Sequence, residues 1–167
     1  MAKFLLVITC SLFLTSDCIN KSENIKELAY SVLNEIIQKD SIFARIVCGK
    51  FAQLTIPEDI IQEFFKKDKS YIEEQIRNSA TLTIDTGKIY FYWKRKNRLE
   101  KTFIDTTCSK NIFYHFTYPI FSKDLQTVVV GITEDCNCML GGWGFKAVYK
   151  KQNGKWKLVK RFDSWIS

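Results

Sequence analysis

The pattern of apolar residues changes near Thr81, and this change constrains the fold more than any other feature of the chain. Before it, apolar residues recur at the spacing of an amphipathic helix. The clearest stripe of this kind consists of Ile25, Leu28, Ala29, Val32, Leu33, Ile36 and Ile37. After it, aromatic and β-branched residues come in short runs that are typical of strands. Helices first and strands afterwards predict an α+β fold, with the helices packed on one face of an antiparallel sheet.

Three helices are expected in the first part of the chain. The first spans about Asn20 to Lys39. A second follows the capping signature Thr55-Ile56-Pro57-Glu58, and a third begins at Ser70. The segment from Ile42 to Leu54 has no pattern that favours helix or strand.

The second part of the chain is expected to form a meander of strands, at Ile89 to Trp93, Ile112 to Phe121, Gln126 to Thr133, Trp143 to Lys151 and Lys155 to Ile166. Asn153-Gly154 predicts a tight hairpin turn between the last two, because both residues tolerate positive φ. Aromatic side chains fall on both faces of the Ile112 to Phe121 strand. This strand is therefore either a central one covered on both sides, or one wall of an apolar cavity for a small ligand.

The register of the last hairpin follows from its turn. With Asn153 and Gly154 as the turn residues, pairing runs to Phe145 opposite Phe162. The core face is then expected to hold Phe145, Ala147, Tyr149, Trp156, Leu158 and Phe162. The other face places basic residues directly opposite one another, with Lys146 facing Arg161 and Lys150 facing Lys157.

This basic face is a candidate binding surface. From Trp143 to Ser167 the chain has seven basic residues and one acidic residue. Anionic lipid head groups, an acidic polysaccharide or an acidic protein are the partners that such a surface attracts. The competing interpretation is that the lysines only keep the outer face of the sheet soluble. Nucleic acid is not expected as a partner, because the aromatic and basic residues from Tyr90 to Arg98 also fit a half-buried strand. The candidate binding residues are Lys146, Lys150, Lys157 and Arg161.

The N-terminal residues predict export. Lys3 precedes an almost purely apolar run from Phe4 to Leu14, which is the layout of a secretory signal and too short to span a bilayer. We expect residues 1–18 to be the signal and residues 19–167 to form a single domain in the periplasm or cell envelope. Two alternatives remain open at Cys18: acylation, which anchors a lipoprotein to the membrane, or cleavage after this residue. Cys10 is a poorer candidate for acylation.

Four cysteines remain after the signal, Cys48, Cys108, Cys136 and Cys138, and an even number in an oxidising compartment predicts disulfides. Cys136 and Cys138 are separated by one residue, so each is expected to pair with Cys48 or Cys108. A metal site at Cys136-Asn137-Cys138 is disfavoured, because zinc sites use wider spacing and His115 is the only histidine. No metal or cofactor is expected.

Part of the C-terminal half resembles a family. The motifs are Pro119 to Asp124, the Cys- and Gly-rich loop, Asn153 to Val159 and Trp165-Ile166-Ser167. Together they resemble uncharacterised exported proteins of Bacteroidetes-type bacteria. The Asn-Gly-Lys-Trp hairpin also occurs in NTF2-like domains. The resemblance implies a bacterial, exported α+β protein, and it transfers no functional residue because the family has no known activity.

Enzyme signatures are missing from the sequence. It contains no nucleophile elbow, no phosphate-binding loop, no zinc-protease motif and no dinucleotide fingerprint. A non-enzymatic partner-binding or envelope-structural module is therefore the preferred hypothesis. The alternatives are a carrier of a small apolar ligand, with a cavity in the sheet, and a hydrolase that uses two carboxylates.

Overall fold

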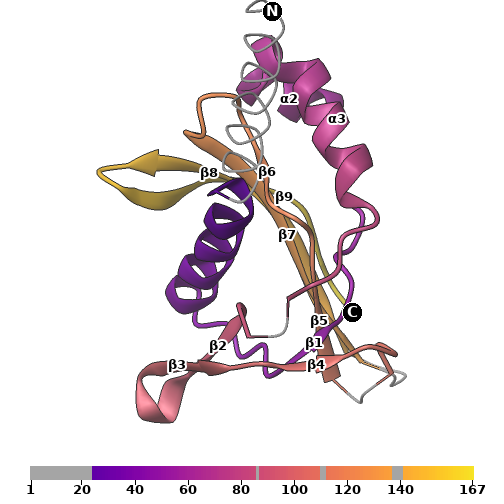
Figure 1. Cartoon of the computed structure of the whole chain (residues 1–167), viewed down its shortest axis with the longest axis vertical. Helices are drawn as coiled ribbons and strands as arrows, with labels where there is room; N and C mark the ends of the chain where they lie inside the picture. The colour runs from indigo at the N-terminus through magenta and orange to yellow at the C-terminus, as the bar shows by residue number, and fades with distance from the viewer. Residues whose placement is uncertain (1–23, 86, 110–111, 137–140) are drawn as a thin grey trace, which may run out of the picture.

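The computed structural model describes residues 24–85, 87–109, 112–136 and 141–167. A seven-stranded sheet forms the middle layer, and helices cover it (Figure 1). The helix over residues 24–39 lies on one face, whereas α2 (Glu58–Phe64) and α3 (Lys69–Ser79) lie on the other. The α+β class and the largely antiparallel sheet are thus confirmed. The expectation that all helices share one face of the sheet is wrong.

The sheet contains strands from both parts of the chain. Its order is β4-β1-β5-β7-β8-β9, with β6 beside β7, and β1 runs parallel to both of its neighbours. A separate two-stranded sheet is formed by β2 and β3. None of the helices in the described part of the chain combines the length and apolar character that crossing a bilayer requires. The strands are β1 (Ile46–Cys48), β2 (Tyr90–Trp93), β3 (Arg98–Lys101), β4 (Phe103–Asp105), β5 (Ile112–Phe116), β6 (Ile120–Phe121), β7 (Thr127–Cys136), β8 (Trp143–Gln152) and β9 (Lys155–Ile166).

The central strand β7 explains why helices are needed on both faces. Val128, Val130 and Ile132 pack into the cluster around the helix of residues 24–39. Val129, between them, packs into the second cluster with Ile61 of α2 and the rest of that helical layer. Since successive side chains of a strand point to opposite faces, a run that is apolar at every position requires two covered faces.

The strand expected from Ile112 to Phe121 is central, as one interpretation of its two aromatic faces required, but it is divided into β5 and β6. Pro119 lies in the break, where it offers no backbone N–H for a ladder. The segments β1, β3 and β4 were not expected from the sequence. α2 and α3 do form where predicted, although neither has a side-chain hydrogen bond at its N-cap.

The last hairpin has the predicted turn, but only part of the predicted register. Asn153 and Gly154 both have positive φ, at 52° and 76°, and pairing from the turn to Tyr149 opposite Leu158 is as expected. One extra residue in β9, Val159, then shifts the register, so that Val148 pairs with Lys160. This is a β-bulge, which turns the following side chains of β9 to the other face.

Two residues that were expected on the core face, Phe162 and Leu158, do not lie in the core as predicted. Phe162 pairs with Lys146 and packs against the α2–α3 side of the sheet instead of sharing a face with Phe145. Leu158 keeps its predicted partner but is 44% exposed near the tip of the hairpin. Arg161 therefore does not face Lys146 as predicted.

A disulfide joins Cys48 of β1 to Cys108, which follows β4, with Cα atoms 4.9 Å apart. The prediction that Cys136 and Cys138 each pair with Cys48 or Cys108 is therefore wrong, because Cys48 and Cys108 pair with each other. Cys136 is also disulfide-bonded, and its partner lies outside the described residues. Because disulfides persist in oxidising compartments, the Cys48–Cys108 bond points to such a compartment. Residues 1–18, with Cys10 and Cys18, and Cys138 lie outside the described residues.

Candidate functional site

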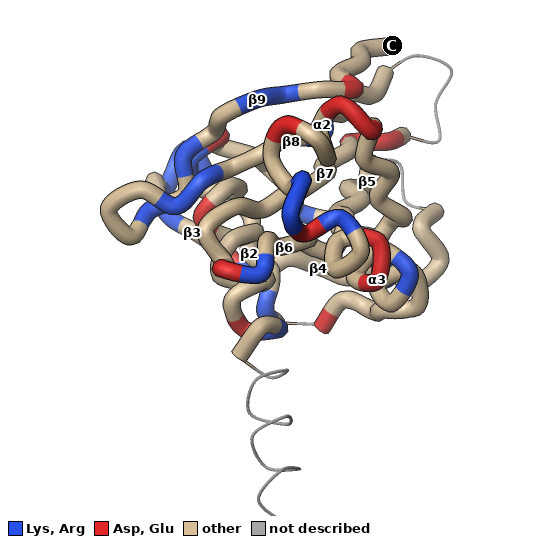
Figure 2. Tube along the Cα trace, turned by 90° about the horizontal axis from the view of Figure 1, so that it is seen from above, with Lys and Arg blue, Asp and Glu red and all other residues tan. Residues whose placement is uncertain are grey.

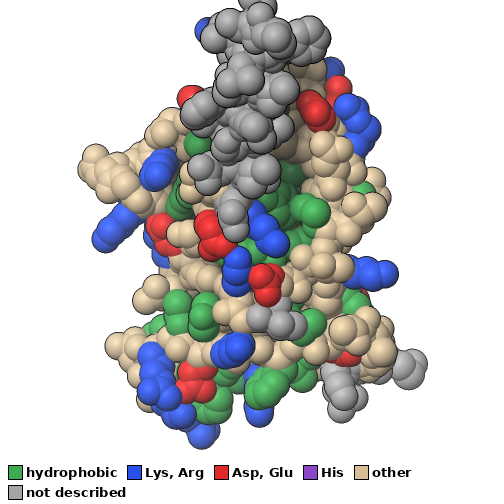
Figure 3. Space-filling view, viewed as in Figure 1, with side chains coloured by type: hydrophobic (Ala, Val, Ile, Leu, Met, Phe, Trp, Pro, Cys, Tyr) green, Lys and Arg blue, Asp and Glu red, His purple; other side chains and the backbone are tan. Residues whose placement is uncertain are grey.

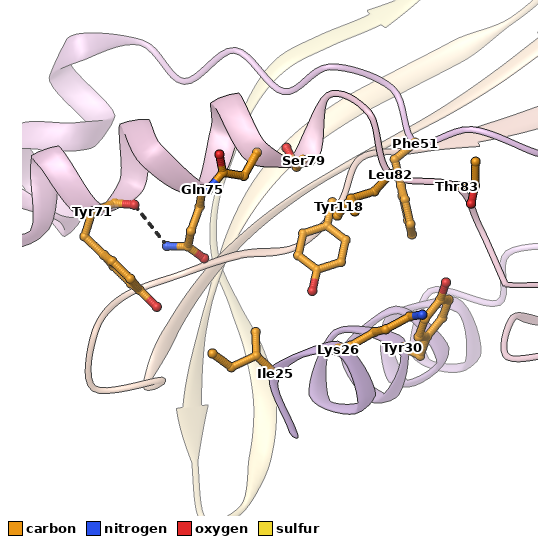
Figure 4. Close-up of a pocket in the computed structure, with 11 residues that line it drawn as sticks. Ile25, Lys26, Tyr30, Phe51, Tyr71, Gln75, Ser79, Leu82, Thr83 and Tyr118 are labelled. Carbon is orange, nitrogen blue, oxygen red and sulfur yellow. Dashed lines mark hydrogen bonds between the residues drawn. The ribbon is translucent and has the colours of Figure 1, made fainter. Parts of the chain in front are cut away.

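A cleft of about 490 Å³ opens between the helix of residues 24–39 and α3 (Figure 4). Three tyrosines from distant parts of the chain line it, Tyr30, Tyr71 and Tyr118. We call it the tyrosine cleft; its other lining residues include Ile25, Lys26, Phe51, Gln75 and Leu82. Its volume falls in the range of small-molecule sites, which is about 300 to 1,000 Å³.

The aromatic wall of the tyrosine cleft is positioned by the break between β5 and β6. Thr117 exchanges hydrogen bonds with Gly131 of β7: its N–H donates to the Gly131 carbonyl at 2.9 Å, and its Oγ1 accepts from the Gly131 N–H at 2.7 Å. The N–H of Ala52 donates to the carbonyl of Phe116 at 2.8 Å. These bonds place Phe51 beside Tyr118, with the two rings edge to face and their centroids 5.3 Å apart.

The opposite wall is fixed to the sheet by Gln75 of α3. Its side-chain amide donates to the carbonyl of Phe121 at 2.7 Å and accepts from the Phe121 N–H at 3.1 Å. Gln75 therefore satisfies both backbone groups of a strand residue and sets the distance between α3 and β6. A second hollow of about 610 Å³ shares Ile25 and Tyr71 with the tyrosine cleft and continues along the helix of residues 24–39.

The tyrosine cleft offers several hydrogen-bond donors, beside the side chains of Asn78 and Thr83, which can both donate and accept. The hydroxyl oxygen of Tyr30 accepts from the Asp85 N–H at 2.7 Å, which leaves its hydrogen to donate. The hydroxyl of Tyr118 points into the cleft (Figure 4), and it has no hydrogen-bond partner among the described residues. Lys26 adds an ammonium group at the mouth, with no acidic partner in the part of the chain that the structure describes.

The electrostatics of the tyrosine cleft keep these phenols protonated. Burial raises the pKa of Tyr118, and the neighbouring Tyr30 and Tyr71 raise it further. Burial also raises the pKa of Tyr30, against the opposing effect of its hydrogen bond from the Asp85 backbone. At neutral pH the cleft therefore presents neutral phenol donors on an apolar wall.

The residues of the predicted basic face do not lie on one face. Lys150 lies over the ring of Phe64 of α2. Lys157 is directly opposite Lys150 across the hairpin. Lys146 is on the same side, because it pairs with Phe162. Arg161 is opposite Ala147 and so faces the helix of residues 24–39.

Three of the seven cations on this hairpin are paired with carboxylates of the molecule. Lys146 binds Asp163 at 2.9 Å, and Arg161 binds Asp40 at 3.3 Å. Lys160 of β9 binds Glu63 of α2 at 2.7 Å. Figure 2 shows the blue segment of β9 close to the red segments of α2. The hairpin therefore offers less free positive charge than its sequence suggests.

The described residues give no support to a carboxylate hydrolase or a metal centre at the tyrosine cleft. None of the described residues that line the cleft is an aspartate or a glutamate. Within the described ranges, no group of three or more histidine, cysteine or acidic side chains is arranged to hold a metal ion. His115 lies in β5, edge-on to Phe113, where burial lowers its pKa and the field of Asp135 opposes that effect.

The tyrosines of the cleft were not singled out from the sequence. Tyr30 sits at the edge of the apolar helical stripe, and Tyr118 was counted among the aromatic residues of a strand. The sequence feature that could have pointed to Tyr118 is the proline after it. A proline interrupts a strand, so the residue before it need not follow the alternation of side chains along that strand.

The chain matches no protein-family model, no curated protein and no solved structure. The similarity to exported Bacteroidetes-type proteins and to NTF2-like domains therefore stays a prediction. The fold and the tyrosine cleft themselves are the basis for any functional assignment.

Proposed function

We propose that this protein is a non-enzymatic binding protein that holds a small amphipathic anion in the tyrosine cleft. The observation that carries the proposal is the combination of an apolar, aromatic wall with phenol donors. One of them is the hydroxyl of Tyr118, which has no hydrogen-bond partner among the residues that the structure describes. The proposal modifies the apolar-ligand alternative of the sequence, which expected a cavity in the sheet: the cleft lies between two helices, and polar groups take part in its lining.

The chemistry of the lining defines the class of ligand. Phe51, Tyr118 and Leu82 offer a surface for an aliphatic chain or an aromatic ring, and each buried methylene contributes about 0.8 kcal/mol. Phenols and an ammonium group donate hydrogen bonds, so the polar end of the ligand must accept them. A carboxylate or a sulfonate meets this requirement, and a hydrogen bond to a charged group is stronger than one to a neutral group.

Blocking the cleft tests the proposal. Leu82 lines the cleft and is 39% exposed, whereas Leu158 of β9 is 44% exposed and does not line it. We expect the native chain to bind anilinonaphthalene sulfonate saturably in a fluorescence titration. Leu82→Trp fills the cleft and weakens binding by about tenfold or more, whereas the matched variant Leu158→Trp binds as the native chain does. Equal binding by both variants would refute a ligand site in the cleft.

The hydroxyl of Tyr118 tests the proposed ligand class. Tyr118→Phe removes one donor and keeps the ring, so affinity for decanoate should fall by about tenfold, while affinity for the neutral alcohol decanol changes little. Since this hydroxyl has no partner in the described part of the protein, the thermal midpoint should stay close to that of the native chain. An unchanged affinity for decanoate contradicts the role of the phenol.

We also infer that the protein is exported and acts in the periplasm or cell envelope. The Cys48–Cys108 disulfide supports this inference, because such bonds persist in oxidising compartments. The intact mass of the protein isolated from its native compartment tests it. Loss of residues 1–18 or acylation at Cys18 supports export, whereas a full-length chain with free thiols contradicts it.

A further inference from the structure

A second surface, separate from the tyrosine cleft, is formed by the β2–β3 hairpin and the residues beside it. The turn consists of Lys94, Arg95 and Lys96, followed by Asn97 in the left-handed conformation at a φ of 49°. All of these turn residues are exposed. Figure 3 shows basic and apolar side chains together at the end of the molecule where Figure 1 places β2 and β3.

Large aromatic residues are exposed next to this turn. Phe103 is 60% exposed and Phe43 is 46% exposed. Phe43 packs edge-on against Phe91 and Trp93 of β2, with centroids 5.0 and 5.9 Å away, so its position is fixed by packing. Exposed apolar side chains that are held rigidly mark an interaction surface. We call the exposed aromatic residues and the surrounding cations the β2–β3 patch.

The charge of the β2–β3 patch is compensated only in part. Residues 88–103 contain six basic residues and one acidic residue, Glu100. Glu100 binds Lys96 at 3.0 Å and Arg98 at 2.8 Å. Lys94, Arg95 and Lys101 have no acidic partner among the described residues. Lys88 binds Glu27 and Asp85, so three of these six cations are paired, as are three of the seven cations between Trp143 and Ser167.

The patch also has a hollow suited to an anionic group. A depression of about 520 Å³ lies between the hairpin and β4. Its charged lining consists of four cations, Arg45, Lys96, Arg98 and Lys101, and one carboxylate, Glu100. Opposite charge is therefore favoured inside the depression as well as at the turn.

We propose that the β2–β3 patch docks on an anionic phospholipid bilayer. The cations bind the phosphates, and Phe43, Trp93 and Phe103 enter the boundary between head groups and acyl chains, where aromatic side chains are stable. A bilayer fits better than an acidic polysaccharide, because cations already cover faces of the rings that a sugar would stack on. The Arg45 guanidinium lies 5.6 Å from the Phe103 ring centroid, and the Lys96 ammonium lies 5.0 Å from that of Trp93.

Co-sedimentation with vesicles tests this proposal, with the ratio of binding to phosphatidylglycerol-containing over pure phosphatidylcholine vesicles as the readout. All variants keep the same N-terminal residues, so the ratio isolates the contribution of the patch. Lys94→Gln combined with Arg95→Gln should lower the ratio by about thirtyfold. The matched control, Lys155→Gln combined with Lys157→Gln, removes the same charge from the other basic hairpin and should change it by about threefold at most.

The aromatic part of the proposal has its own variant. Phe103→Ser should weaken binding to the anionic vesicles by about tenfold even at raised salt, because the apolar contribution is not screened. Equal losses in the two charge variants overturn the proposal in favour of diffuse attraction. Binding to heparin without binding to vesicles overturns it in favour of a polysaccharide partner.

Discussion

Removing the Cys48–Cys108 bond should destabilise the protein strongly, because the bond closes a long loop. The two cysteines are separated by 60 residues along the chain, and the loop contains α2, α3 and the β2–β3 hairpin. For a loop of this length, the lost chain entropy of the unfolded state corresponds to about 4 kcal/mol at room temperature. The loop also carries one wall of the tyrosine cleft and the whole turn of the β2–β3 patch.

Urea unfolding of the double variant Cys48→Ala with Cys108→Ala measures this effect. With a slope of about 2 kcal/mol per molar urea, the midpoint should fall by about 2 M. Each single variant should lose as much as the double variant, because either change opens the loop. A mutant chain is preferable to a reductant, since Cys136 is disulfide-bonded as well. A loss below about 1 kcal/mol would refute the argument from loop length.

Three further predictions concern the sheet and its contacts. Gln75→Leu leaves the backbone N–H and carbonyl of Phe121 without the Gln75 side chain and should lower the free energy of unfolding in urea by about 2 to 3 kcal/mol. An unchanged midpoint would contradict the stabilising role of these two hydrogen bonds. In Gly131→Ala the new methyl group would lie 2.8 Å from Cγ2 of Thr117, costing about 1 to 3 kcal/mol, and adding Thr117→Ser should restore most of it. Because the folded-state pKa of His115 is lowered from 6.5, the folded protein binds a proton less readily than the unfolded chain, and stability should fall as pH drops below that value. His115→Gln should remove this dependence from urea midpoints measured across that range, and an unaltered pH profile would rule the histidine out.

The parts of the fold that were predictable depend on local rules. Asn153-Gly154 specifies its turn because the turn type requires positive φ at two adjacent residues. The bulge at Val159 was not predictable in the same way. Nothing at this position differs in sequence from an ordinary strand, and the bulge is visible only in the register, where Tyr149 pairs with Leu158 and Val148 with Lys160.

The sequence contained a sign that both faces of the sheet are buried, but the order of the helices and strands favoured a single helical layer. Val128 to Ile132 is apolar at nearly every position, which indicates a strand covered on both faces. The succession of helices followed by strands suggested one helical layer, yet it does not determine which face each helix covers. That choice is made by long-range contacts, such as those of Val129 with the α2–α3 side.

The disulfide and the tyrosine cleft also required the tertiary structure. Cys48 meets Cys108 because β1 pairs in parallel with β4, and neither short strand has a sequence signal. The tyrosines at positions 30, 71 and 118 come from a helix, a second helix and a break between strands. Residue spacing carries no information about such a meeting, whereas the basic residues of the last hairpin stood out through their sequence density alone.

The most direct test of ligand binding in the tyrosine cleft is to map the binding site by amide NMR during a titration with decanoate. A ligand bound in the tyrosine cleft should cause saturable shifts at Phe51, Tyr71 and Leu82, with small changes at Lys155 and Lys157 on the distant hairpin. Shifts that spread over the basic surfaces and leave the cleft unaffected would contradict the proposed ligand site.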